Sequence, residues 1–158
     1  MDLLPVFQWL EDTTIGVVIR ESLWLFPVIE AVHLLALALI GGMILVVDLR
    51  LLGFGIRSQS SAALATSLHP WLVGGLITMV ATGVPMFLSE AIKCYYSPPF
   101  WYKMCFFAVA LLYTFTVRKR VAAADAVALG PVWGRLSALT SLALWFCVGF
   151  SGRWIAFY

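Results

Sequence analysis

The sequence predicts an all-α integral membrane protein: an up-down four-helix bundle with a short interfacial helix at its N-terminus. Of the 158 residues, 63% are hydrophobic and only 11% are charged, whereas a soluble domain has about 25% charged residues. The mean hydropathy is +0.99. Four apolar segments approach or exceed the roughly 20 residues that cross a ~30 Å hydrocarbon core. Because the links between them are short, we expect one transmembrane domain over residues 1–158.

The N-terminal segment before these spans mixes apolar and acidic residues. This pattern predicts a short helix lying on the outer membrane surface, and the alternative is an ordered tail packed on the bundle. The segment has no cationic start and no clear small-residue cleavage site, so we do not expect a signal peptide. Its large apolar residues are Leu3, Leu4, Phe7, Trp9 and Leu10.

The four spans are expected at about residues 23–47, 68–88, 100–117 and 136–158. The second helix could begin before its span, as early as Ser61. In lipid these segments must be helical, because every backbone polar group needs a partner within the segment. Short links make consecutive helices antiparallel, which gives the up-down order.

Lysine and arginine set the expected orientation, since cytoplasmic loops carry an excess of these residues. The cluster Arg118-Lys119-Arg120 dominates the count. The first and third loops are therefore expected in the cytoplasm, and both termini outside it. The cations counted on the cytoplasmic side are Arg50, Arg57, Arg118, Lys119, Arg120 and Arg135, and those on the opposite side are Arg20, Lys93, Lys103 and Arg153.

Several short motifs make the chain similar to a family of small bacterial inner-membrane proteins, a four-helix domain of unknown function. The resemblance covers nearly the whole chain and implies a bacterial inner membrane, in which both termini would lie in the periplasm. The side of the termini rests on the lysine and arginine count and not on the resemblance, which brings no established activity and no functional residue. The motifs are Glu30-Ala-Val-His33, Asp48-Leu-Arg50-Leu-Leu-Gly53, Thr82-Gly83, Pro99-Phe100 with Lys103, Trp145, and Gly152-Arg153-Trp-Ile-Ala-Phe.

Three residues are candidate cofactor ligands: His33, Met79 and His69. A histidine inside a span is by default a functional-site hypothesis, and its sharpest form here is axial ligation of a b-type haem. The alternative is a packing histidine, hydrogen-bonded to a neighbour such as Glu30 or Thr78. At ~1.5 Å per residue, His33 lies about 22 Å above the inner edge, His69 about 12 Å and Met79 about 27 Å. These depths favour His33 and Met79 as a pair of axial ligands over His33 and His69. The sequence indicates haem b as a possible cofactor and no other.

The three cysteines form no CxxC pair. Cys105 and Cys147 fall in apolar runs and are expected to be packing residues. Cys94 falls between spans and is the one cysteine that we expect to be reactive.

Two functions follow from these observations. The preferred one is a non-catalytic membrane subunit that packs against partner membrane proteins or copies of itself in the bilayer. The alternative is an electron-transfer subunit that uses His33 to hold haem b or contact a quinone, and a proton-coupled carrier using Glu30 and His33 is a third reading. No nucleotide, zinc-protease or serine-hydrolase motif occurs, so we assign no catalytic or metal residue and expect no enzyme activity from the chain alone. The net charge of +2 gives no indication of nucleic-acid binding.

Two ion pairs are predicted to fasten the first span to the last. Glu30 and Asp48 are eighteen positions apart, five turns of a helix, and so are Arg135 and Arg153. In antiparallel neighbours this spacing pairs Glu30 with Arg153 and Asp48 with Arg135. A charge within lipid is costly unless it is paired.

Overall fold

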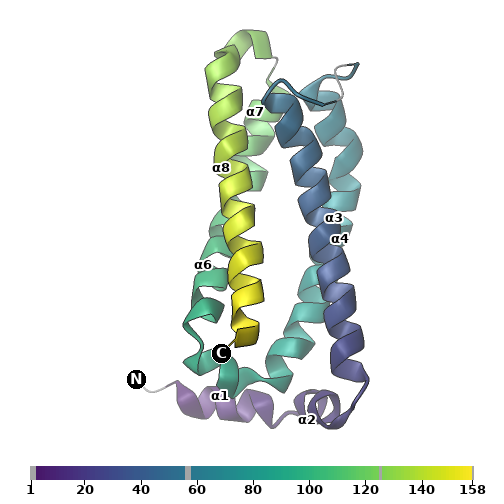
Figure 1. Cartoon of the computed structure of the whole chain (residues 1–158), viewed down its shortest axis with the longest axis vertical. Coiled ribbons are helices and arrows are strands. Elements are labelled where there is room, and N and C mark those ends of the chain that lie inside the picture. The colour runs from purple at the N-terminus through teal and green to yellow at the C-terminus, as the bar shows by residue number, and fades with distance from the viewer. Residues whose placement is uncertain (1–2, 56–57, 125, 158) are drawn as a thin grey trace.

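The computed structural model describes residues 3–55, 58–124 and 126–157, with side chains omitted for 126–131. Within these ranges the chain is helical and has no strand, which confirms the all-α class (Figure 1). The elements are α1 (Leu4–Glu11), α2 (Thr14–Glu21), α3 (Leu25–Leu51), α4 (Ser61–Ser89), α5 (Ala91–Tyr96), α6 (Pro98–Tyr113), the π-helix η1 (Thr114–Arg118), α7 (Lys119–Ala123), α8 (Ala126–Trp154) and the 3-10 helix η2 (Ile155–Phe157).

Four helical segments are long and apolar enough to cross a membrane: α3, α4, the run from α6 through α7, and most of α8. They lie side by side in Figure 1, with α1 and η2 at one end of the molecule and α7 at the other; we call these the α1 end and the α7 end. Helix α4 begins at Ser61, the early start that the sequence allows. The third segment runs from Pro98 to Ala123, further than expected, because η1 and α7 continue α6 without a break.

The four helices do not contact one another equally. Helix α3 packs against both α4 and α8, and α6 packs against α8, but α4 and α6 scarcely touch. Helix α7 meets α4 at one end, and α5 joins the two helices at the other. A seam is therefore left between α4 and α6 along most of their length.

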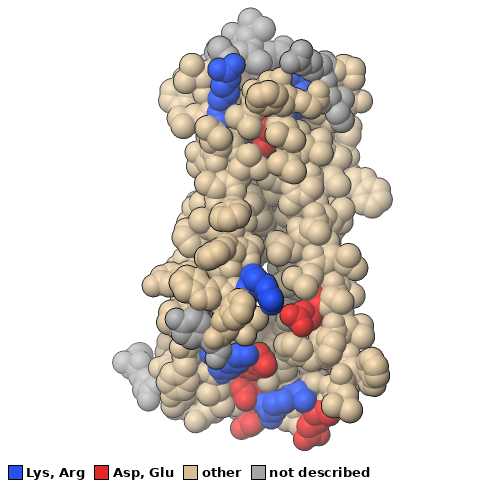
Figure 2. Space-filling view, viewed as in Figure 1, with Lys and Arg blue, Asp and Glu red and all other residues tan. Residues whose placement is uncertain are grey.

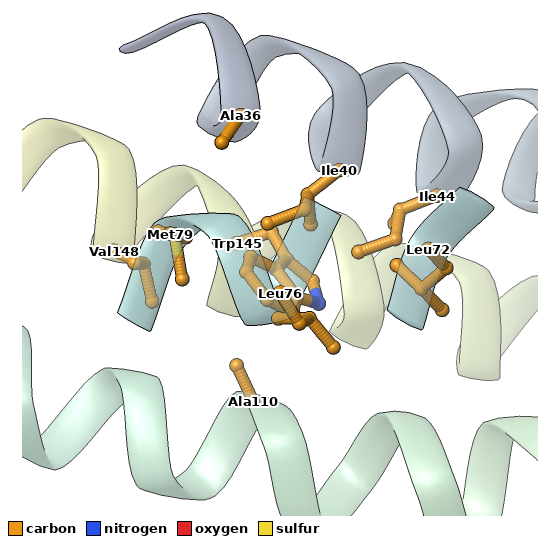
Figure 3. Packing of buried hydrophobic residues seen from close by; sticks show 9 residues of the cluster. All are labelled: Ala36, Ile40, Ile44, Leu72, Leu76, Met79, Ala110, Trp145 and Val148. Atoms are coloured by element: carbon orange, nitrogen blue, oxygen red, sulfur yellow. The ribbon is translucent and has the colours of Figure 1, made fainter. Parts of the chain in front are cut away.

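An apolar core fills the middle of the molecule. Ile40 and Ile44 of α3 are almost fully buried, and they pack with Leu76 of α4 and with Trp145 of α8. Figure 3 shows these side chains converging between the helices. Burying a large apolar side chain contributes about 1.5–3 kcal/mol, although in lipid close packing matters more than escape from water. The cluster comprises Ala36, Ile40, Ile44, Leu72, Leu76, Met79, Ala110, Trp145 and Val148.

Helices α1 and α2 lie across the α1 end (Figure 1). The sequence predicts one short helix there, and the structure has two, separated by a turn at Thr13. The Thr13 hydroxyl caps α2 by accepting from the Gly16 amide. Gly16 sits so close to the end of α4 that a Cβ would lie 2.6 Å from the Leu88 carbonyl oxygen. Glu11 fixes α1 to α5, because its Oε2 accepts from the Ile92 amide at 2.6 Å.

Charged side chains gather toward the two ends, and the waist on the face shown in Figure 2 is free of them. The α7 end holds Arg50, Lys119, Arg120 and Arg135, whereas Arg57 lies outside the described residues. The α1 end mixes cations with acidic residues, including the ion pairs Arg20–Glu11 and Lys93–Glu90. The excess of positive charge at the α7 end agrees with the charge asymmetry read from the sequence.

Candidate functional site

Two hollows at the α1 end share one wall. The first, which we call the side chamber, is an apolar cavity of about 450 Å³ between α4 and α6. The second, the vestibule, is a more polar cavity of about 320 Å³ toward the end of the molecule. The two cavities have in common His33, Gly83, Phe87, Phe100 and Lys103.

The side chamber opens on the surface of the molecule. Val80 and Val84 of α4 and Trp101 and Met104 of α6 line it and are 42–52% exposed, which places its mouth in the seam where these helices part. Phe7 of α1 is buried at its outer edge. The Phe7 ring lies 5.7 Å from Phe87, 5.1 Å from Tyr95 and 6.1 Å from Trp101, between ring centroids.

A hydrogen-bond chain fixes the orientation of His33. The Nδ1 atom of His33 lies 2.9 Å from the Thr82 hydroxyl oxygen. That hydroxyl donates its own proton to the carbonyl of Thr78, one turn earlier in α4, at 2.7 Å. With that proton on the Thr78 carbonyl, the hydroxyl accepts from His33, and in this tautomer of the neutral ring Nδ1 carries the proton and Nε2 the lone pair. The hydrogen bond to Thr82 involves Nδ1, so it leaves Nε2 on the other side of the ring for a further partner.

Gly83 makes room for this imidazole. A Cβ at Gly83 would lie 3.2 Å from Cε1 of His33 and 3.6 Å from Nδ1. Such contacts are tighter than ordinary packing, so a larger residue would push the ring away from Thr82. The sequence motif Thr82-Gly83 thus supplies both the hydrogen-bond acceptor and the space.

Lys103 brings a positive charge into the same wall. It is the sixth residue of α6. Its side chain runs along Gly152 of α8, where an added Cβ would lie 3.7 Å from Nζ of Lys103. No described residue forms an ion pair within 4 Å of its ammonium group. A lysine in a membrane-crossing helix is costly unless it has a partner or faces a polar cavity. The segment that contains Lys103 is apolar enough to be such a helix, and Lys103 lines both the chamber and the vestibule.

The vestibule adds titratable groups to this wall. Glu30 and the ion pair Lys93–Glu90 line it, with 3.6 Å between the charged atoms of the pair. Cys94 also lines it but is buried in α5. Burial, and then the Glu90 carboxylate, raise the pKa of the Cys94 thiol to about 11. The structure places Cys94 in a helix rather than in a loop, and a raised pKa lowers the amount of thiolate, which is the nucleophile. Both features disfavour the expected reactivity of Cys94, which stays a prediction.

A family model matches residues 6–158, nearly the whole chain. The chain belongs to DUF6644, a family of unknown function. No curated protein and no solved structure matches it. Membership confirms the resemblance at the level of a family of unknown function, while the bacterial origin and the membrane location of this DUF6644 chain stay predictions.

The DUF6644 chain brings two of the three candidate ligands to one cavity. His33 and Met79 both line the side chamber, although Met79 also packs in the apolar core. His69 lies toward the α7 end and lines a different cavity, with its ring edge-on to Phe115 at 6.3 Å. Nowhere in the described part of the chain do three or more His, Cys, Asp or Glu residues cluster to hold a metal ion.

Asp48 forms a buried ion pair, but the predicted partner is wrong. Its Oδ1 accepts from Nε of Arg118 at 2.7 Å, and the side chains are 0% and 6% exposed. Arg118 also donates to the Ile44 carbonyl at 3.1 Å. Arg135, the expected partner, is exposed. Arg118 was placed in the third loop, but η1 keeps this residue inside the helical run and turned toward α3.

The predicted pair of Glu30 with Arg153 is not formed either. Within the described ranges, Glu30 has no ion pair within 4 Å. The Arg153 guanidinium lies instead over the Phe157 ring, 5.3 Å from its centroid. Equal spacing of charged residues along two helices places the residues of each helix on one face, but it does not determine which faces of the two helices meet. The hydrogen-bond partner of His33 is also neither Glu30 nor Thr78, but Thr82.

Proposed function

We propose that this chain is a multi-pass membrane protein that binds a quinone-type molecule in the side chamber, with its ring at His33 and Lys103. The proposal rests on one observation: a hydrogen-bond donor, Lys103, and an acceptor, His33, line the same wall of an apolar cavity. Four helices long and apolar enough to cross a membrane support the location. The charge asymmetry supports both termini in the periplasm, so that the chamber opens into the outer leaflet.

The shape of the chamber suits a ring with a long apolar tail. Small-molecule sites are mostly apolar cavities of about 300–1,000 Å³ with a few convergent polar groups, and the chamber of about 450 Å³ falls in this range. Its mouth between Val84 and Met104 would face lipid, so a ligand could enter from the bilayer without crossing water. The tail would lie in the seam between α4 and α6.

The polar wall suits both redox forms of such a ring. The Lys103 ammonium can donate to a quinone carbonyl or a quinol oxygen, whereas the Nε2 lone pair of His33 can accept only from a hydroxyl. A carboxylate ligand, such as a fatty acid, would be attracted by Lys103 but repelled by the lone pair. A quinol uses both groups, and Glu30 in the adjoining vestibule could take up a proton that His33 accepts.

A binding titration tests this proposal. The protein in phosphatidylcholine nanodiscs is titrated with decyl benzoquinone, and quenching of tryptophan fluorescence is followed, since Trp101 lines the chamber. The quinol is then measured by competition. We expect saturable quenching. Lys103→Met should weaken the binding of both quinone and quinol about tenfold, the size of one charge-assisted hydrogen bond. His33→Leu should weaken the binding of the quinol more than that of the quinone.

Matched controls come from the other end of the molecule. His69→Leu and Lys119→Met remove the same side-chain types outside the chamber and should leave both affinities unchanged. Quenching that rises linearly without saturation would show partitioning into lipid alone. Equal weakening in all four variants would also contradict the assignment.

Haem b is a second candidate for the same chamber. It is favoured because His33 and Met79 both line the chamber and Thr82 holds Nδ1 of His33, as outer partners commonly do for ligating histidines. An absorption spectrum decides it: a Soret band, a dithionite-induced α-band and loss of both in His33→Ala would establish haem, with His69→Ala as control. A protein without these bands has no haem.

The preferred expectation from the sequence, a subunit that packs against partner proteins or copies of itself, stays a prediction. The two proposals are compatible, since a ligand chamber on one face leaves the α3 and α8 faces for contacts. Mass measurement of the protein extracted under mild conditions would detect such partners. No enzyme activity is proposed for the chain alone, because a redox step would need a second electron carrier.

A further inference from the structure

A third cavity lies at the opposite end of the α4–α6 seam. It has a volume of about 350 Å³ and is enclosed by α4 on one side and by η1 and α7 on the other. We call it the seam pocket. We propose that it holds the headgroup of an anionic glycerophospholipid, with Lys119 and His69 facing the phosphate. The proposal is independent of the quinone but rests on the membrane location.

The local sequence explains why there is a hollow here. Alanines line the pocket from both sides, among them Ala65 of α4 and Ala122 of α7, so no long side chain fills it. The π-helix η1 widens the helix at this level, and such turns are frequent at functional sites. Pro70 lacks an amide proton, so α4 is without its usual backbone hydrogen bond to the Thr66 carbonyl.

The pocket carries an uncompensated positive charge. Arg118 lines it but is neutralised by Asp48 at 2.7 Å. Lys119 also lines it, is exposed, and forms no ion pair with any described residue. None of the described lining residues is acidic. The surrounding α7 end is cationic as well, which suits the anionic lipids of a cytoplasmic leaflet.

The rest of the wall points to a lipid rather than a free phosphate. Leu72, Pro70 and Phe115 form an apolar side of the pocket, and Phe115 is 38% exposed in the seam. An inorganic phosphate would bury nothing against this surface. A glycerophospholipid would place its phosphate near Lys119 and its first acyl carbons along Phe115, continuing into the bilayer between α4 and α6.

Two adjacent cations allow a matched test. Lys119 lines the pocket, whereas Arg120 is exposed and is not part of its lining. The full chain in a neutral detergent is titrated with dioctanoyl phosphatidylglycerol, dioctanoyl phosphatidylcholine or inorganic phosphate, and bound lipid is counted by native mass spectrometry. We expect phosphatidylglycerol to bind at least tenfold more tightly than phosphatidylcholine. Lys119→Gln should lower that affinity about fivefold, and Arg120→Gln should leave it unchanged.

The remaining results separate the other occupants. Equal losses in the two variants would show diffuse attraction by the charged end and overturn the site. Equal binding of both lipids would overturn the role of charge, and competition by inorganic phosphate at similar concentrations would replace the lipid with a phosphate site. Quinone binding by the Lys119→Gln variant is also measured in nanodiscs, and it should be unchanged if the variant is folded. This control distinguishes a failure of the lipid proposal from a failure of the quinone proposal.

Discussion

The two ends of the molecule differ in how they accommodate buried charge. Toward the α7 end, Asp48 and Arg118 close on each other at 2.7 Å, and neither side chain is more than 6% exposed. Toward the α1 end, Lys103 has no ion-pair partner among the described residues and lines two cavities with His33. The first arrangement neutralises its own charge within the chain, although Oδ2 of Asp48 is buried without a hydrogen-bond partner. The second leaves a donor and an acceptor for something outside the chain.

This difference separates a structural use of charge from the binding use that we propose for Lys103. A buried pair with short hydrogen bonds holds helices together, but it offers nothing to a ligand. A cation that borders a cavity costs more to keep in an apolar region, and a ligand offsets that cost when it binds. Sequence alone cannot tell these uses apart, because both appear as one charged residue in an apolar run.

The largest expected effect comes from breaking the closed pair. Asp48→Asn leaves the Arg118 guanidinium buried without a counter-charge and should destabilise the protein by about 3–5 kcal/mol, measured as unfolding in detergent. Replacing Asp48 and Arg118 together with leucine should recover most of the loss. Glu90→Gln, which breaks the exposed pair with Lys93, should cost under about 1 kcal/mol. A double variant as unstable as Asp48→Asn would show that the pair is not the cause.

A smaller effect should appear at the open end without a change of charge. Gly83→Ala places a methyl group 3.2 Å from Cε1 of His33, which should turn the ring and weaken quinol binding about tenfold. Gly74→Ala on the same helix is the control, because no atom lies within 4 Å of its added Cβ. Equal affinities for these two variants would mean that the position of His33 does not matter for binding.

The smallest effect concerns the edge of the vestibule. The thiol of Cys94, with its pKa raised to about 11, should react with maleimide only slowly at pH 7.5. The pKa of this thiol in the folded protein lies above its ordinary value of 9.0, so the folded state holds the proton more tightly than the unfolded state. The resulting contribution to stability is present below pH 9 and is lost as the pH rises through 11. Glu90→Gln removes one cause of the shift and should lower the pH at which labelling begins. Rapid labelling at pH 7.5 in the folded protein would contradict the burial of Cys94.

Hydropathy sufficed to predict the helical class and the positions of the long helices, because apolar length is a local property. It could not predict which faces meet. Asp48 was matched to Arg135 by counting turns, but Arg118, the last residue of the π-helix η1, forms the pair. A count of turns along two chosen helices does not consider a partner from a third.

The candidate site was predicted only in part. His33 stood out as a histidine inside a span, but its partner Thr82 depends on how α3 and α4 lie against each other. Lys103 was counted among the cations on the side opposite the cytoplasm, although the expected span of residues 100–117 already contained it. Phe7 at the edge of the chamber depends on how α1 folds back over the bundle, which local sequence does not encode.

The apolar core between the two ends has an electrical consequence. Ile40, Ile44, Leu76 and Trp145 form a layer without charged groups between the level of His33 and that of Asp48. In an energised membrane the voltage would fall mainly across this insulating layer, where moving one charge takes about 2.3 kcal/mol per 100 mV. Protons taken up or released at His33 would stay on the side of the field from which they came. If His33 exchanges protons as proposed, this exchange should therefore respond only weakly to membrane potential.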